Sequence, residues 1–194
     1  MIQNNMKNKK QTKQKGFTIV ETLVSIFILL IAITGPLTFA QSGLRASFLA
    51  RDQIVAFYLA QDVIETIKHL RDNHALSGDS GTWLFRLGDC ANSYGTNTTK
   101  CSLDTSGLNV ISDTCLLDRC NPLEFDTNLK KFGYSKNSAS KYTRTIYVTE
   151  LVQNQEAEIV VLVEWESNFF ATRRIVIQEN IFNWVEGAVN SANN

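Results

Sequence analysis

The stretch that decides the fold is Lys15-Gly16-Phe17-Thr18-Ile19-Val20-Glu21, the junction between a basic leader and an apolar segment. Residues 1–16 carry five lysines and no acidic residue. After Glu21 the next charged residue is Arg45, so residues 22–44 form an uncharged run of 23. At about 1.5 Å rise per residue, a helix of that length crosses a bilayer core of about 30 Å. We therefore expect a leader over 1–16 and a transmembrane helix over 17–44, with the N-terminus in the cytoplasm and the C-terminal domain outside.

Glu21 distinguishes this segment from an ordinary membrane anchor. A carboxylate within an apolar span costs about 2.5 kcal/mol or more, and such residues usually serve a function. Glu21 follows Phe17 by four residues, which is about one helical turn. A cut between Gly16 and Phe17 would create a cationic α-amine one turn from this anion. In a second copy of the chain, the same amine would be able to neutralise Glu21.

The segment over residues 16–26 closely resembles the prepilin processing site of type IV pilins and type II secretion pseudopilins. The resemblance implies that a prepilin peptidase cuts after Gly16 and methylates the new N-terminal Phe17. It also implies that Glu21 guides the subunit into a helical filament. A secretory signal peptide fits less well, because its cleavage site would follow the apolar region and not precede it.

The helix is expected to continue to about residue 72, within a 45–75 segment that forms its amphipathic half. Gly35 and Pro36 predict a kink or a loosened turn, because proline removes a backbone donor and clashes with the preceding turn. A tolerated kink in a membrane helix is one interpretation, and a segment that loses helicity in a filament is the other. A predicted core stripe comprises Ala50, Ile54, Phe57, Ala60, Ile64 and Ile67, widened by Leu59, Val63 and Leu70.

Residues 76–141 are predicted to be a variable, cysteine-containing loop region. Residues 82–87 favour a short strand, and residues 88–141 are polar and without clear periodicity. The four cysteines are Cys90, Cys101, Cys115 and Cys120, an even number in an exported segment, which indicates disulfides. Three connectivities are possible, and we favour the local pairs Cys90–Cys101 and Cys115–Cys120. Zinc is disfavoured, because there is no CxxC pair and both histidines lie in another segment.

Residues 142–187 are predicted to be an antiparallel β-meander, followed by a frayed tail over 188–194. Apolar and polar residues alternate over 142–152, 157–166 and 169–179, with turns near 153–156 and 167–168. Residues 180–185 are expected to close the edge of the sheet. The fold class is therefore α+β, with one long helix packed on an antiparallel sheet, as in type IV pilins.

Composition and motifs point away from catalysis and nucleic-acid binding. The leader holds five of the 19 basic residues, which leaves 14 against 19 acidic ones in the mature part. That balance disfavours a nucleic-acid surface, which needs clustered Lys and Arg. We find no catalytic motif, metal site or cofactor site, and expect the protein to be a substrate of an enzyme rather than an enzyme.

Residues 59–65 and 161–165, together with the Asn183-Trp184 pair, resemble PilV-type minor pilins. That resemblance implies a minor pilin of a type IV pilus, at or near the tip, that primes assembly or mediates adhesion. Its partners would be other pilins packed helix to helix, the prepilin peptidase and the inner-membrane assembly platform. A pseudopilin, a major pilin and a signal-anchored binding domain that never polymerises are the alternatives. The expected location is the membrane before assembly and the pilus at the cell surface afterwards.

Overall fold

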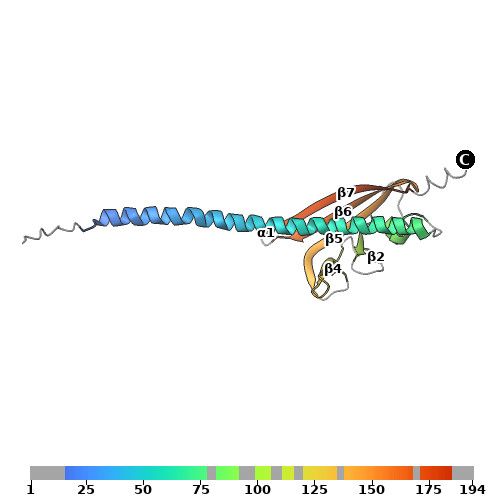
Figure 1. The fold of residues 1–194 in the computed structure, drawn as a ribbon, viewed down its shortest axis with the longest axis horizontal. Coiled ribbons are helices and arrows are strands. Elements are labelled where there is room, and N and C mark those ends of the chain that lie inside the picture. Colours follow the sequence, from blue (N-terminus) through green and yellow to red (C-terminus); the bar gives the residue numbers. More distant parts are fainter. Residues whose placement is uncertain are drawn as a thin grey trace, which may run out of the picture. The chain divides into compact units, whose positions relative to one another are not determined.

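A computed structural model describes residues 16–77, 82–91, 99–105, 111–115, 120–134, 138–167 and 171–184. The chain forms two compact units, Met1–Phe48 and Leu49–Asn194, which are treated separately below. The helix, the 3₁₀ segment and the strands are coloured along the sequence in Figure 1. The predicted leader up to residue 15 and the predicted tail over 188–194 lie outside the described residues, as do parts of the 76–141 region and of the turn near 168.

Helix α1 (Ile19–Ser77) begins in the first unit, where all described side chains are exposed. α1 is helical through Gly35 and Pro36, so neither residue ends the helix, and the predicted kink stays a prediction. Just beyond the proline, the hydroxyl of Thr38 donates to the carbonyls of Thr34 (3.1 Å) and Gly35 (2.8 Å).

From Leu49 onward, one face of α1 packs on the sheet. Its buried residues are Ala56, Leu59, Ala60, Val63, Ile64 and Ile67. The predicted stripe was therefore right from Leu59 to Ile67 and wrong before it, because Ala50, Ile54 and Phe57 are exposed. Ala60 and Ile64 belong to two overlapping apolar stripes of the helix, one with Ala50, Ile54 and Phe57 and the other with Ala56 and Leu59. The sheet covers the second stripe. Helical periodicity alone does not distinguish these two faces.

The described strands form one seven-stranded antiparallel sheet. Their bounds are β1 Cys101–Asp104, β2 Ile111–Thr114, β3 Pro122–Asp126, β4 Lys131–Gly133, β5 Ala139–Val152, β6 Glu156–Glu166 and β7 Thr172–Phe182. β5, β6 and β7 form the predicted meander, with Val148 opposite Ile159 and Ile159 opposite Glu179. The other edge of β5 is shared, because β3 pairs with its first part and β1 pairs at Ile146. β2 and β4 extend the sheet beyond β1 and β3.

The described parts of the 76–141 region contain more secondary structure than their sequence indicates. The predicted strand over 82–87 is wrong: residues 83–84 form a turn, and a 3₁₀ segment, η1 (Phe85–Ala91), follows. Trp83, Leu84 and Leu87 are buried there while Phe85 is exposed, a pattern that does not alternate as a strand would. The loop predicted over 88–141 is also wrong in part, because β1 to β4 lie within it. Strands of three to five residues are too short to produce a clear period in the sequence.

Both favoured disulfides are confirmed. Cys90–Cys101 joins η1 to β1, and Cys115–Cys120 closes a short loop between β2 and β3. The backbone N–H of Cys115 also donates to the carbonyl of Lys100 at 2.8 Å. The two bridges therefore hold η1, β1 and the start of β3 together beside β5.

Arg144 is a charged residue at the centre of the core, and its side chain lies between α1 and β1 with no exposed surface. Nη1 donates to the carbonyl of Leu59 at 2.9 Å, and Nη2 donates to the carbonyl of Leu103 at 2.7 Å. Nη1 also lies 3.3 Å from Oδ2 of the half-exposed Asp62. Because a buried charge needs bonded donors, and Nη1 and Nη2 find theirs on α1 and β1, this guanidinium fixes the position of β1 relative to α1.

Candidate processing and assembly segment

The structure places the start of α1 immediately after the predicted cleavage site. Gly16, Phe17 and Thr18 are not helical, and the helix begins at Ile19. The backbone N–H of Glu21 donates to the hydroxyl of Thr18 at 3.3 Å. Thr18 is therefore the N-cap residue and Glu21 lies three positions after it, as in a capping box. The helix therefore begins two residues after Phe17, and the Gly16–Phe17 peptide bond lies outside it.

The peptide bond between Gly16 and Phe17 is accessible. Both residues are exposed, and a Cβ added at Gly16 would have no heavy atom within 4 Å. Nothing in the described chain therefore requires glycine at position 16 for steric reasons. A need for glycine here would come from a peptidase that must approach the backbone closely.

Glu21 is the only charged residue between Phe17 and Leu44. It lies in the first turn of α1, where the helix dipole favours a negative charge. Its carboxylate has no hydrogen bond or ion pair with another residue in the described ranges, although its backbone is bonded at both ends. An amine on Phe17 would be the nearest cation in the sequence, and the amine of a second copy would carry the same charge.

The other hydroxyl-bearing residues of this helix bond to the helix itself. Thr22 donates to the carbonyl of Ile19 and Ser25 to the carbonyl of Glu21, each at 2.7 Å. The further members of this set are Thr34, Thr38 and Ser42. Such bonds make hydroxyls compatible with an apolar environment. One helix of the described chain, α1, is long and apolar enough to cross a membrane.

Comparison with known protein families identifies this segment. A family model described as "Prokaryotic N-terminal methylation motif" matches residues 11–35, a range that contains Gly16, Phe17 and Glu21. No curated protein and no solved structure matches the chain. The motif indicates a type IV pilin or pseudopilin, which implies processing by a prepilin peptidase, incorporation into a pilus-like assembly, and a membrane anchor that later reaches the cell surface.

The remaining predicted site residues lie elsewhere. The four cysteines belong to the Leu49–Asn194 unit, while Gly35 and Pro36 lie in the anchor. Within the described ranges, no three His, Cys, Asp or Glu side chains are placed to hold a metal ion. Sequence reasoning missed the role of Thr18, although the Thr18-Ile19-Val20-Glu21 order is the pattern of a capping box.

Proposed function

We propose that the chain is a minor pilin of a type IV pilus, and that it acts as a structural subunit and not as an enzyme. The observation that carries the proposal is the order of features at the N-terminus. An accessible Gly16-Phe17 bond precedes a capped helix whose first turn holds Glu21 and whose apolar surface is entirely exposed. That exposed surface needs lipid first and neighbouring helices later, as expected for a subunit that leaves the bilayer.

The assembly step follows from electrostatics. With the lysine-rich leader in the cytoplasm, the C-terminal domain is outside, and cleavage after Gly16 leaves a cation on Phe17. In a filament, the Phe17 amine of one copy neutralises Glu21 of its neighbour and sets the axial register. This pairing removes the cost of about 2.5–3.5 kcal/mol for a lone charge in an apolar environment. The other contacts are between apolar helices, and the assembly platform supplies the subunit.

The minor role and the tip position are supported by features of the C-terminal unit. The resemblance to PilV-type pilins over residues 161–165 and the long cysteine-containing region favour a low-copy subunit that primes assembly or mediates adhesion. A type II secretion pseudopilin would have the same N-terminal processing site, acidic residue and apolar helix. A major pilin would differ in abundance. A signal-anchored domain that never polymerises would keep its leader.

The primary test is mass spectrometry of the mature N-terminus from native membranes. We expect a chain that begins at Phe17 with a methylated amine. Gly16→Ala should slow cleavage, although the structure leaves space for the added methyl group. An intact leader on the wild-type protein would contradict the proposal.

A second test separates processing from assembly. Glu21→Ala should be cleaved and inserted normally but lost from sheared filaments. Ser25→Ala is the matched control, because its hydroxyl bonds only to the carbonyl of Glu21 one turn away. Equal recovery of Glu21→Ala and wild-type protein in filaments would refute the charge pairing. Quantification of the subunit against the main filament protein distinguishes a minor pilin from a major one.

A further inference from the structure

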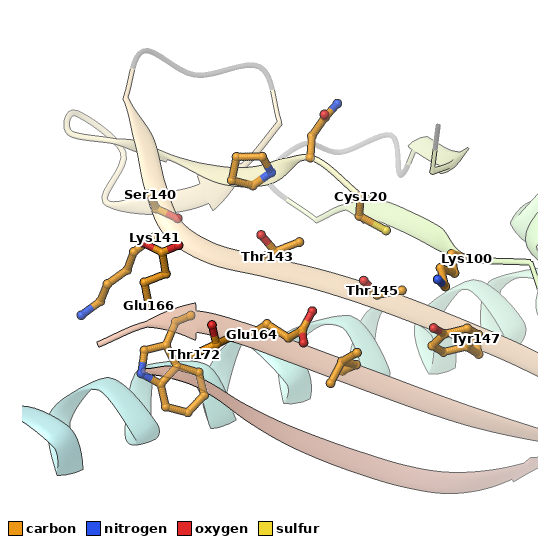
Figure 2. A pocket seen from close by; sticks show the side chains of 14 residues that line it. Lys100, Cys120, Ser140, Lys141, Thr143, Thr145, Tyr147, Glu164, Glu166 and Thr172 are labelled. Carbon is orange, nitrogen blue, oxygen red and sulfur yellow. The ribbon is translucent and has the colours of Figure 1, made fainter. Parts of the chain in front are cut away.

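A groove of about 710 Å³ lies on the face of the sheet that points away from α1, within the Leu49–Asn194 unit. Its floor consists of outward-facing residues of β5 and β6, as Figure 2 shows for Thr143, Thr145, Tyr147 and Glu164. Thr143 is directly opposite Glu164 in the ladder, so these two side chains stand about 5 Å apart at Cβ. The residues that alternate with these along each strand, such as Arg144 on β5 and Val163 on β6, face the core.

One wall of the groove is formed by Lys100, Cys120, Asn121 and Pro122. Both disulfides support this wall. Cys120 is bonded to Cys115, whose N–H donates to the carbonyl of Lys100, and Lys100 is followed by the bridged Cys101. The groove is therefore fixed by covalent links. Its volume lies within the range of about 300–1,000 Å³ that is usual for ligand sites.

The lining is polar and carries no excess of positive charge. It contains two lysines, Lys100 and Lys141, and two acids, Glu164 and Glu166, and Lys141 already forms an ion pair with Asp52 at 2.6 Å. This balance disfavours polyanions, which bind where cations gather. The remaining polar groups are neutral: the amide of Asn121 and the hydroxyls of Ser140, Thr143, Thr145, Tyr147 and Thr172.

Several of these groups have unused hydrogen-bonding capacity. Thr145 is only 7% exposed, and its hydroxyl bonds to no other residue in the part of the chain that is described. The half-buried carboxylate of Glu164 is likewise without a partner among the described residues. The indole Nε1 of Trp165, which also lines the groove, is buried without a partner among the described residues, and a buried donor left without a bond costs about 1–3 kcal/mol. A carboxylate only accepts, whereas a threonine hydroxyl both donates and accepts, so the matching ligand must offer both kinds of group.

From this arrangement we propose that the groove binds a neutral oligosaccharide. Sugar hydroxyls donate to Glu164 and both donate to and accept from Thr145, while Leu162 and the ring of Tyr147 provide apolar surface for the C–H face of a pyranose ring. A peptide fits less well, because extended peptides bind at open sheet edges or in apolar pockets, and this floor is the face of a sheet. Sugar binding by this groove would specify the adhesive role proposed above. Only the biological setting of the binding rests on that role.

The test uses the full-length mature chain in detergent on an array of neutral hexose and N-acetylhexosamine oligosaccharides, followed by calorimetric titration of the best binder. Glu164→Gln and Thr145→Val should each weaken binding at least tenfold. Glu158→Gln and Thr149→Val are the matched controls, because they lie on the same strands and the same face but outside the groove. Both controls should bind as the wild type does.

Three outcomes would overturn the proposal: no binding at millimolar sugar, binding only to sulfated glycans or to peptides, or equal affinity in the groove variants and their controls. Tryptophan fluorescence confirms that each variant is folded before its affinity is compared. The purified chain is tested without assembly, so failure here leaves the processing result unchanged. Conversely, an unprocessed chain that still binds sugar would refute only the proposed pilin function.

Discussion

Replacing Arg144 with alanine should lower the free energy of unfolding of the Leu49–Asn194 unit by about 3–5 kcal/mol. The guanidinium makes two short hydrogen bonds, to the carbonyls of Leu59 and Leu103. A hydrogen bond that involves a charged group contributes about 1.5–3 kcal/mol, so the pair contributes roughly 3–6 kcal/mol. Alanine also removes the cost of burying Nε, which has no partner in the described residues, and this brings the expected value toward the lower part of the range.

A second substitution separates hydrogen bonding from packing. Arg144→Met loses the same two hydrogen bonds but fills most of the volume that alanine leaves empty, so its cost should be smaller than that of alanine by roughly 2 kcal/mol. Asp62 is half-exposed and stays solvated in both variants. Arg174→Ala is the control, because Arg174 is exposed on β7 and should change stability by no more than about 0.5 kcal/mol.

The assay is urea unfolding of the mature chain in mild detergent, followed by tryptophan fluorescence. All three tryptophans, Trp83, Trp165 and Trp184, lie in the unit that contains Arg144. If Arg144→Ala costs less than about 1 kcal/mol, the guanidinium does not join α1 to β1 as we argue. If alanine and methionine lower the free energy of unfolding equally, filling the volume at this position does not stabilise the fold.

Burial, together with the negative charge of Asp52 and its hydrogen bond to the phenol, raises the pKa of Tyr142 to about 12. Since the unfolded value is near 10, the contribution of Tyr142 to stability should be constant below pH 10 and fall as the pH rises toward 12, and Tyr142→Phe should flatten that fall in urea titrations. Thr18→Ala should remove about 1 kcal/mol from the first turn of α1, and unchanged amide exchange over residues 19–22 would argue against the cap. Replacing Cys90 and Cys101 with serine should cost about 2–3 kcal/mol, measured by the same unfolding assay; an unchanged midpoint would show that this bridge contributes nothing.

Long, periodic elements could be predicted from the sequence, and short or asymmetric ones could not. β5 and β6 have 14 and 11 residues, enough for alternation to be visible, and each favoured cysteine pair is close in sequence. β4 has three residues and carries no period of its own. Ile54 and Phe57 fit a helical stripe as well as Ala56 and Leu59 do, and only the sheet decides between them.

The candidate sites divide in the same way. The processing segment is a local pattern, so Gly16, Phe17 and Glu21 could be proposed from their order along the chain and its resemblance to a prepilin processing site. The groove joins Lys100 and Asn121 to β5 and β6, and those contacts depend on disulfides and on strand pairings that no local pattern encodes. Arg144 likewise looked like one more polar residue in an alternating strand, because its partners are remote backbone carbonyls.

The hydroxyls of α1 that bond to their own helix have a consequence for how the anchor changes surroundings. Thr22, Ser25 and Thr38 keep the same partners whether lipid tails or other helices lie outside them. Moving the anchor from one apolar medium to another therefore exchanges dispersion contacts and requires no rearrangement of these hydrogen bonds. In the proposed assembly, Glu21 is the charged side chain of residues 17–44 that must cross the apolar interior, so its neutralisation by a partner amine would be the step that controls departure from the bilayer.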